Sequence, residues 1–173
     1  MKRYLLLIFV LALTSFGLEI KKMELISSAF KNTEMIPSLY TCDGKNISPP
    51  ILWNHPPEKT KSLALICDDP DAPNKTWVHW IVYNIKPTSK ELPAKILSQE
   101  KLSNGARQGI NDFGKIGYGG PCPPSGIHRY FFKLYALDTE LEIQQPVTKE
   151  KLERAIDGHI LEEAILIGKY SNH

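Results

Sequence analysis

The chain has 173 residues, the usual length of one domain, and can bury a core without several disulfides or a metal. Apolar residues make up 42% and charged residues 23%, as in ordinary globular proteins. The formal net charge is only +2 and no run of Lys and Arg stands out, which argues against nucleic acid and anionic membranes as partners.

The first 17 residues predict a secretory signal peptide. Lys2 and Arg3 precede an apolar run over residues 4–13, and Ser15 and Gly17 have the spacing that a signal peptidase prefers. The run is shorter than the ~20 residues that span a bilayer. A buried first strand and an uncleaved anchor are the alternatives. Cleavage after Gly17 would leave 19 basic and 19 acidic residues, and would place one domain, residues 18–173, in the periplasm or outside the cell.

Short strands separated by loops dominate the rest of the chain, in which 13 prolines punctuate apolar runs. Strands are predicted at residues 23–30, 51–53, 61–67, 77–85 and 128–137, with a long irregular segment at 86–121. Thr148 as N-cap and Gly158 as C-cap predict a helix between them. Residues 160–170 favour a strand over a continued helix. The sum predicts an antiparallel β sandwich with one late helix.

Three cysteines offer one possible disulfide. Cys67 lies in the apolar run 61–67 and is expected to be buried, whereas Cys42 and Cys122 lie in loops rich in Gly and Pro. In an oxidising compartment a disulfide would persist, and Cys42–Cys122 is the favoured pair. Three unpaired cysteines are the alternative, because spacing alone does not determine the Cα separation.

A stiff acidic turn follows the apolar run 61–67. In Asp69-Pro70-Asp71-Ala72-Pro73 the two prolines fix φ and remove backbone donors, so the segment cannot extend a β ladder. It can project Asp69 and Asp71 at a defined angle from the strand end. Such a tight loop also favours a cis X–Pro bond, for which Ala72–Pro73 is the candidate. A rigid turn with two solvated acids is the alternative.

A Gly- and Pro-rich stretch, residues 117–130, leads into the strand at 128–137. Its glycines allow backbone N–H groups to approach a ligand closely. His128 and Tyr130 are two residues apart and therefore share one face of the strand. Arg129 points to the other face, where it is expected to pair with a carboxylate.

His79 lies in a strongly apolar strand, so it needs a hydrogen-bond partner if it is buried. One interpretation is a core histidine that is bonded to a backbone carbonyl. The other is that His79 and His128 flank one site, in which Asp69 orients an imidazole. Alternation predicts two faces for this strand, with Trp77, His79 and Ile81 on one and Val78, Trp80 and Val82 on the other.

These segments together resemble the phosphatidylethanolamine-binding protein family, and most closely its bacterial and archaeal Raf-kinase-inhibitor-like branch. The resemblance rests on residues 69–73, on Trp77-Val78-His79-Trp80, and on the stretch from Gly120-Pro121 to Gly126-Ile127-His128-Arg129-Tyr130. Residues 40–50 and 158–170 also look like that branch. The resemblance therefore covers nearly all of residues 22–170.

The resemblance implies a large antiparallel sheet packed on a smaller one, with a pocket that holds phosphate-like groups and needs no cofactor. Val78 departs from the eukaryotic members, which often have a second histidine there, so their ligand preference does not carry over. Matched by motif, the ligand-binding residues would be Asp69, Pro73, His79, Gly120, His128 and Tyr130.

A binding protein for a small anion is the favoured function. The imidazoles, the Tyr130 hydroxyl and the Gly120 N–H would donate to a phosphate, a phosphoryl head group or a carboxylate. The alternative is a module that inhibits or binds a protease or signalling partner, since the family that this chain resembles includes protease and kinase inhibitors. Either a monomer or a homodimer is compatible with the sequence.

An enzyme is the less favoured reading. Ser125 or Cys122 would be the nucleophile, His128 the base and Asp69 the residue that orients it. However, Ser125 lacks the Gly-x-Ser-x-Gly spacing of a nucleophile elbow, and Cys122 is the disulfide candidate. Asp69, Asp71, His79 and His128 are suitable metal ligands by type, but no metal-binding spacing supports such a site, and none is predicted.

Overall fold

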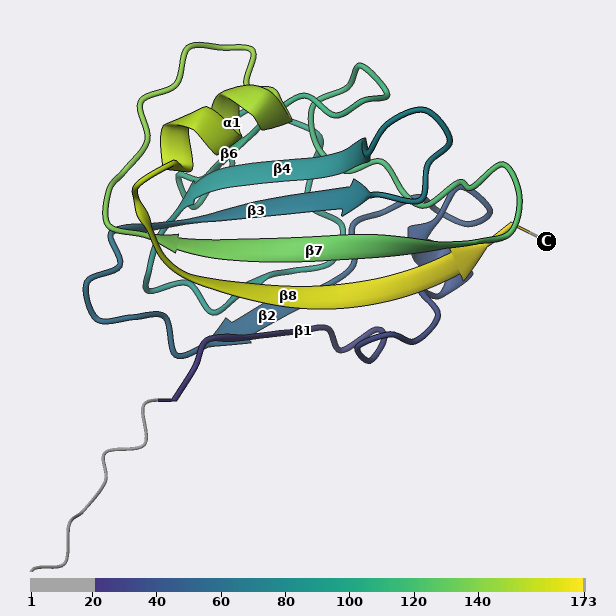
Figure 1. Ribbon diagram of the computed structural model, residues 1–173, viewed down its shortest axis with the longest axis horizontal. Coiled ribbons are helices and arrows are strands. Elements are labelled where there is room, and N and C mark those ends of the chain that lie inside the picture. The colour runs from purple at the N-terminus through teal and green to yellow at the C-terminus, as the bar shows by residue number, and fades with distance from the viewer. Residues whose placement is uncertain (1–20, 173) are drawn as a thin grey trace, which may run out of the picture.

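Two antiparallel sheets and one helix make up the computed structural model, which describes residues 21–172 (Figure 1). The small sheet has the order β1-β2-β5 and the large sheet the order β6-β4-β3-β7-β8. The predicted sandwich of a large and a small sheet with one late helix is confirmed. The small sheet comprises β1 (Glu24–Ile26), β2 (Ile51–Asn54) and β5 (Glu91–Leu92). The large sheet comprises β3 (Ser62–Asp69), β4 (Trp77–Ile85), β6 (Arg107–Gln108), β7 (Ile127–Leu137) and β8 (Ile160–Ser171).

Strand β3 lies in the middle of the large sheet and is buried on both faces. Leu63, Leu65 and Cys67 belong to the core between the two sheets, while Ala64 and Ile66 belong to a second core that includes the helix α1 (Lys149–Ile156). A strand covered on both sides has no solvent face, which explains why its apolar run is continuous instead of alternating.

The first strand is shorter than predicted, because β1 ends at Ile26 and not at Phe30. The Ser27 hydroxyl donates to the carbonyl of Pro50 and accepts from the N–H of Ala29, so a side chain takes the place of the next ladder bonds. The chain then turns, passes a 3-10 helix (Ser38–Tyr40), and enters the loop that precedes β2.

The last segment is a strand, as the sequence favours. β8 pairs with β7 from Ile127 opposite Ser171 to Leu137 opposite Ile160. The helix before it has the predicted N-cap, with Thr148 accepting from the N–H of Lys151, and Gly158 follows its last turn with a positive φ of 77°.

An ion cluster that the sequence analysis missed joins the large sheet to α1. The Asp68 carboxylate is fully buried on the helix-facing side of β3. Its oxygens lie 2.9 Å from the Nζ of Lys133 on β7 and 2.5 Å from the Nζ of Lys149 at the start of α1. A buried carboxylate without cationic partners would be strongly unfavourable, so this cluster anchors the helix to the sheet.

A disulfide joins Cys42, in the loop before β2, to Cys122, in the loop before β7, with Cα atoms 5.4 Å apart. This is the pair that the sequence favours. Cys67 is a free, buried thiol, and burial raises its pKa well above the usual value. Oxidation is therefore expected to leave Cys67 untouched in the folded protein.

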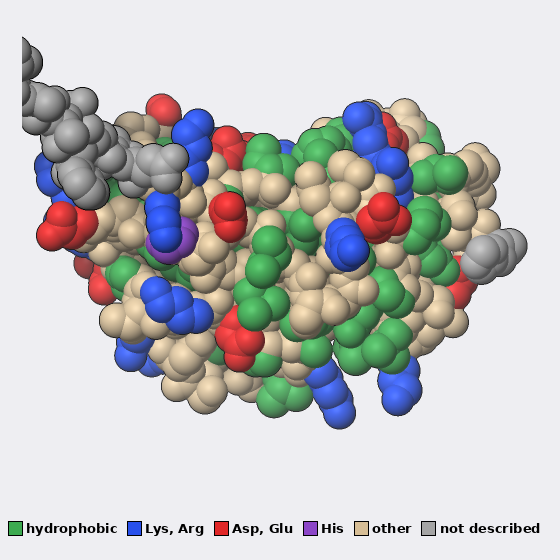
Figure 2. Space-filling model, turned by 90° about the horizontal axis from the view of Figure 1, so that it is seen from below, with side chains coloured by type: hydrophobic (Ala, Val, Ile, Leu, Met, Phe, Trp, Pro, Cys, Tyr) green, Lys and Arg blue, Asp and Glu red, His purple; other side chains and the backbone are tan. Residues whose placement is uncertain are grey.

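On the face that Figure 2 shows, Lys and Arg side chains are interspersed with Asp and Glu and form no continuous basic area. This agrees with the absence of a basic run in the sequence. Among residues 21–172, no helix is long and apolar enough to cross a membrane. The predicted signal peptide, residues 1–17, lies outside the described residues.

The disulfide predicts a thiol count. Unfolded under non-reducing conditions, the protein should react with an alkylating reagent at one cysteine of its three, and at all three after reduction. Intact mass after labelling measures both numbers. Three labelled thiols before reduction would contradict the Cys42–Cys122 pairing.

Removing the buried carboxylate at Asp68 should destabilise the protein. Asp68→Asn leaves two cationic lysines without their partner, and we expect a loss of about 2 kcal/mol in the free energy of unfolding. The exposed pair Arg107–Glu100 provides the control, because Glu100→Gln should cost less than about 0.5 kcal/mol. Denaturant unfolding compares the two variants, and equal effects would refute the proposed anchoring role.

Candidate functional site

A cavity of about 190 Å³ opens where β3, β4 and β7 approach the same end of the large sheet. We call it the anion cavity, after the ligand class that the sequence predicts for it. Five of the six predicted ligand-binding residues line it, namely Asp69, Pro73, His79, His128 and Tyr130. The rest of its wall consists of Ala72, Trp77, Phe113 and the segment 122–124.

A β-bulge aims His79 into this cavity. Cys67 of β3 pairs with Trp80 of β4, but the next residue, Asp68, pairs with Val78, so His79 has no partner across the ladder. The bulge shifts the alternation of the strand by one residue. The predicted assignment of faces is therefore wrong beyond His79: Trp80 lies in the core between the sheets, and Ile81 lies with the cluster that packs against α1.

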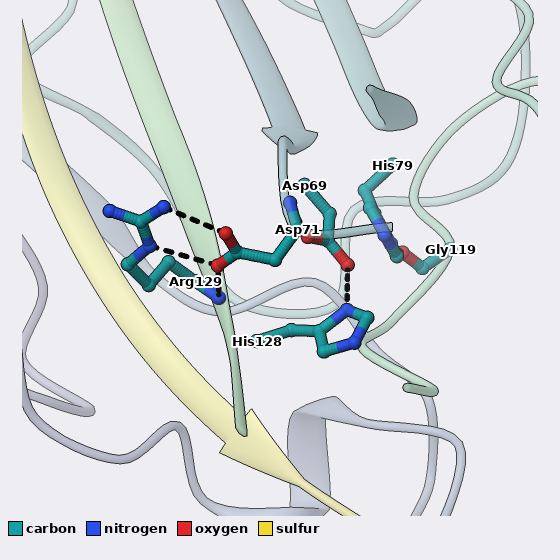
Figure 3. Close-up of polar contacts among 6 residues, drawn as sticks. All are labelled: Asp69, Asp71, His79, Gly119, His128 and Arg129. Atoms are coloured by element: carbon teal, nitrogen blue, oxygen red, sulfur yellow. Dashed lines mark hydrogen bonds and ion pairs between the residues drawn. The ribbon is translucent and has the colours of Figure 1, made fainter. Parts of the chain in front are cut away.

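His128 and Asp69 form the central hydrogen bond of the site (Figure 3). The Nδ1 of His128 lies 2.7 Å from Oδ2 of Asp69, and both residues are buried, at 7% and 3% exposure. The bond connects the end of β3 to the start of β7. The tautomer that donates from Nδ1 to the carboxylate leaves Nε2 of His128 for a ligand.

Arg129 faces away from the cavity and holds the acidic turn from the other side, as Figure 3 shows. Its guanidinium donates to both oxygens of Asp71, at 2.8 and 2.7 Å, and its backbone N–H donates to the same carboxylate. Hydrogen bonding to Arg129 lowers the pKa of Asp71 to about 2, so this carboxylate stays ionised. The prediction that Arg129 pairs with a carboxylate is confirmed.

The prediction of a cis bond at Ala72–Pro73 is wrong. The cis peptide bond that the structure records in residues 21–172 joins Gln145 to Pro146. In the acidic turn, Oδ1 of Asp69 accepts the N–H of Asp71 at 2.8 Å, and this side-chain bond closes the turn with a trans peptide.

His79 is bonded to a backbone carbonyl and also lies in the cavity wall, so both interpretations of this residue hold. Its Nδ1 lies 2.6 Å from the carbonyl oxygen of Gly119, while the ring also lines the anion cavity. Burial lowers the pKa of His79, although the bond to Gly119 and nearby carboxylates oppose this. The neutral ring donates from Nδ1, which leaves the lone pair of Nε2 as an acceptor until a proton arrives.

Two hydrogen-bond donors in the cavity wall have no partner among residues 21–172. They are the hydroxyl of Tyr130, a fully buried residue, and the indole Nε1–H of Trp77. A buried donor without a partner costs free energy, so both groups are candidates to donate to a ligand in the cavity. The Tyr130 hydroxyl also lies near Asp69, and burial together with that carboxylate raises the pKa of Tyr130. Sequence reasoning missed Trp77 as a site residue, although its place two positions before His79 was the available signal.

Gly120 does not line the anion cavity, and its predicted role as a donor is wrong. Its N–H donates to Oδ1 of Asn46 at 2.7 Å. A Cβ at this position would lie 2.5 Å from the carbonyl oxygen of Tyr40, so the close packing of two loops, and not ligand contact, requires glycine.

Asp69, His79 and His128 meet at the anion cavity, but the remaining candidates for catalysis or metal binding lie outside it or are engaged elsewhere. The sulfur of Cys122 belongs to the disulfide, and Ser125 is exposed and does not line the cavity. The carboxylate of Asp71 faces Arg129. Within residues 21–172, no group of three His, Cys, Asp or Glu side chains is placed to hold a metal ion.

Comparison with known proteins gives a consistent result. A profile of the phosphatidylethanolamine-binding protein family matches residues 26–171. A UPF0098 protein of Methanothermobacter thermautotrophicus is 55% identical over 148 residues, covering 86% of this chain and 98% of the relative. A UPF0098 protein of Aquifex aeolicus is 51% identical over 151 residues, covering 86% of this chain and 88% of the relative.

Solved structures with the same fold include a putative phosphatidylethanolamine-binding protein homologue from Chlamydia trachomatis. It is 43% identical, with a TM-score of 0.81, over 88% of this chain and 99% of that one. YbcL of E. coli, described as a new member of the mammalian family, is 34% identical with a TM-score of 0.81, over 88% of this chain and all of that one. The chain belongs to the phosphatidylethanolamine-binding protein family, in its bacterial and archaeal branch.

Proposed function

We propose that this protein is a non-catalytic binding protein whose anion cavity takes phosphate, a phosphoryl head group or a carboxylate. One observation carries the proposal: Tyr130 and Trp77, two residues of the cavity wall, have buried donor atoms that form no hydrogen bond within residues 21–172. An oxyanion supplies several acceptor oxygens at once. The volume of about 190 Å³ is below that of sites for drug-sized ligands, and suits a small group.

The two histidines add a proton-dependent part to this site. Each has its Nδ1 engaged, by Asp69 in His128 and by Gly119 in His79. An incoming anion therefore favours protonation of Nε2, which turns an acceptor into a charged donor.

We propose no catalytic step. Of the two candidate nucleophiles, the sulfur of Cys122 is bonded in the disulfide and Ser125 is exposed outside the cavity.

We also propose that the protein acts outside the cytoplasm. The apolar N-terminal run and the Cys42–Cys122 disulfide both support export, since such bonds persist in oxidising compartments.

Phosphate should bind to the protein and raise its melting temperature, and His128→Gln should weaken this binding about tenfold or more. The variant removes the imidazole ring and its Nε2 atom but keeps a polar group beside Asp69. Titration calorimetry measures Kd, and the thermal shift gives an independent readout. His159→Gln is the matched control, since His159 is exposed and pairs with Asp138 on the surface.

Two results would count against the anion cavity as the binding site. One is an absence of phosphate binding to the unmodified protein. The other is equal binding by His128→Gln and His159→Gln, which would place the phosphate elsewhere. Unfolding curves of both variants show whether each is folded at the temperature of the titration.

Sulfate affinity should rise as the pH falls from about 7.5 to about 5, because the protonated imidazole of His79 binds an anion more tightly than the neutral one. Sulfate remains a dianion over this range, so the change reports on the protein. Since burial lowers the pKa of His79, its share of the rise appears below the ordinary range of histidine. His79→Gln should reduce the rise, which we expect to be about three- to tenfold. A pH-independent affinity would contradict the role of the imidazoles.

A further inference from the structure

A second cavity, of about 290 Å³, adjoins the anion cavity. The two share Phe113 and Cys122 as wall residues. They also meet at the Gly119 segment, whose carbonyl accepts from His79 in the anion cavity while Gly119 itself lines the second cavity. A ligand seated in one cavity therefore lies next to the other.

The hydrogen-bond acceptors in the wall of the second cavity are largely occupied. Oδ1 of Asn111 accepts from the N–H groups of Phe113 and Lys115. Oδ1 of Asn46 accepts from the N–H of Gly120, and the carbonyl of Gly119 accepts from His79. No Asp or Glu lines this cavity.

Its donors, in contrast, are available. Within residues 21–172, Lys115 forms no ion pair, and neither the amide nitrogen of Asn46 nor the hydroxyl of Ser98 has a hydrogen-bond partner. A cavity with one cation, two further donors and no carboxylate in its wall is suited to an acidic group.

One tight turn, residues 111–115, carries both the shared wall and the cation. The Asn111 side chain caps the backbone N–H groups of Phe113 and Lys115, and Gly114 between them has a positive φ of 73°. The Phe113 ring is 42% exposed and rests edge-on against Trp77 and His79, with centroids 5.5 and 5.4 Å away. Phe113 is thus a partition between the two cavities.

We propose that the second cavity is a subsite for an additional acidic group on the ligand that the anion cavity holds. The ligand class is then a short phosphorylated or phosphonylated carboxylic acid, with the phosphoryl group among Tyr130, Trp77 and the histidines. Its carboxylate passes the edge of Phe113 and pairs with Lys115. This inference rests on the proposed function, because the anion cavity anchors one end of the ligand.

A series of phosphonates tests the subsite. Phosphonoacetate, phosphonopropionate and phosphonobutyrate are each compared with the alkylphosphonate of equal length in which a methyl group replaces the carboxylate. We expect one spacing to bind about three- to tenfold more tightly than its alkyl partner, as a partly exposed charge-assisted bond provides. Titration calorimetry at constant ionic strength measures each Kd.

Lys115→Gln should abolish this advantage and leave the Kd of inorganic phosphate and of the alkylphosphonates unchanged. Lys59→Gln is the matched control, because Lys59 is exposed in the loop between β2 and β3 and lines neither cavity. The subsite is overturned if no phosphonocarboxylate binds more tightly than its alkylphosphonate, or if the tighter binding persists in Lys115→Gln. Either result leaves phosphate binding in the anion cavity intact. If neither phosphate nor alkylphosphonates bind, both the subsite and the proposed function fall.

Discussion

The hydrogen bond between Asp69 and His128 is the contact on which the site depends. It joins two buried side chains from the end of β3 and the start of β7, which lie 59 residues apart in the chain. On the opposite side, the pair Asp71–Arg129 joins the same two segments. Because consecutive strand residues point to opposite faces, His128 and Arg129 contact the acidic turn from its two sides. The turn therefore has little freedom, and the cavity wall is preorganised.

The alternation of side chains along β3 also explains why its two neighbouring acids, Asp68 and Asp69, have different partners. Asp69 lines the anion cavity and contacts His128, whereas Asp68 faces the helix and pairs with Lys133 and Lys149. A carboxylate on either face is buried and is therefore stable only with a partner. The end of β3 thus links the anion cavity to the packing of α1 on the sheet.

Irregular backbone positions the remaining site residues. The bulge at His79 allows a histidine and a core tryptophan to follow one another on the same side of β4. The turn 111–115 places Phe113 against the rings of Trp77 and His79. The disulfide at Cys122 holds the Pro-rich segment that completes the wall. Regular strands alone would leave this end of the sheet open to solvent.

The amino-acid sequence by itself determined the class of fold and the two segments that build the site. Apolar runs and turn residues mark β3, β4, β7, β8 and α1 closely, because burial and capping are properties of a few neighbouring residues. The acidic turn, His79 and the His128–Tyr130 pair stand out for the same reason. The predicted range of the first strand is too long, because the contact that ends the strand, from Ser27 to Pro50, is made with a residue distant in the sequence.

Only the tertiary structure decided which groups line the cavity. Gly120 turned out to serve loop packing, because Asn46 and Tyr40 approach it from another part of the chain. The bulge at His79 depends on the register between β3 and β4, which no local pattern encodes. The unpartnered donors of Trp77 and Tyr130, and the mostly occupied acceptors of the second cavity, likewise depend on contacts between segments far apart in the sequence. Hydrogen-bond satisfaction is a property of the folded molecule, and this property separated the candidate ligand contacts from groups that already have a structural partner.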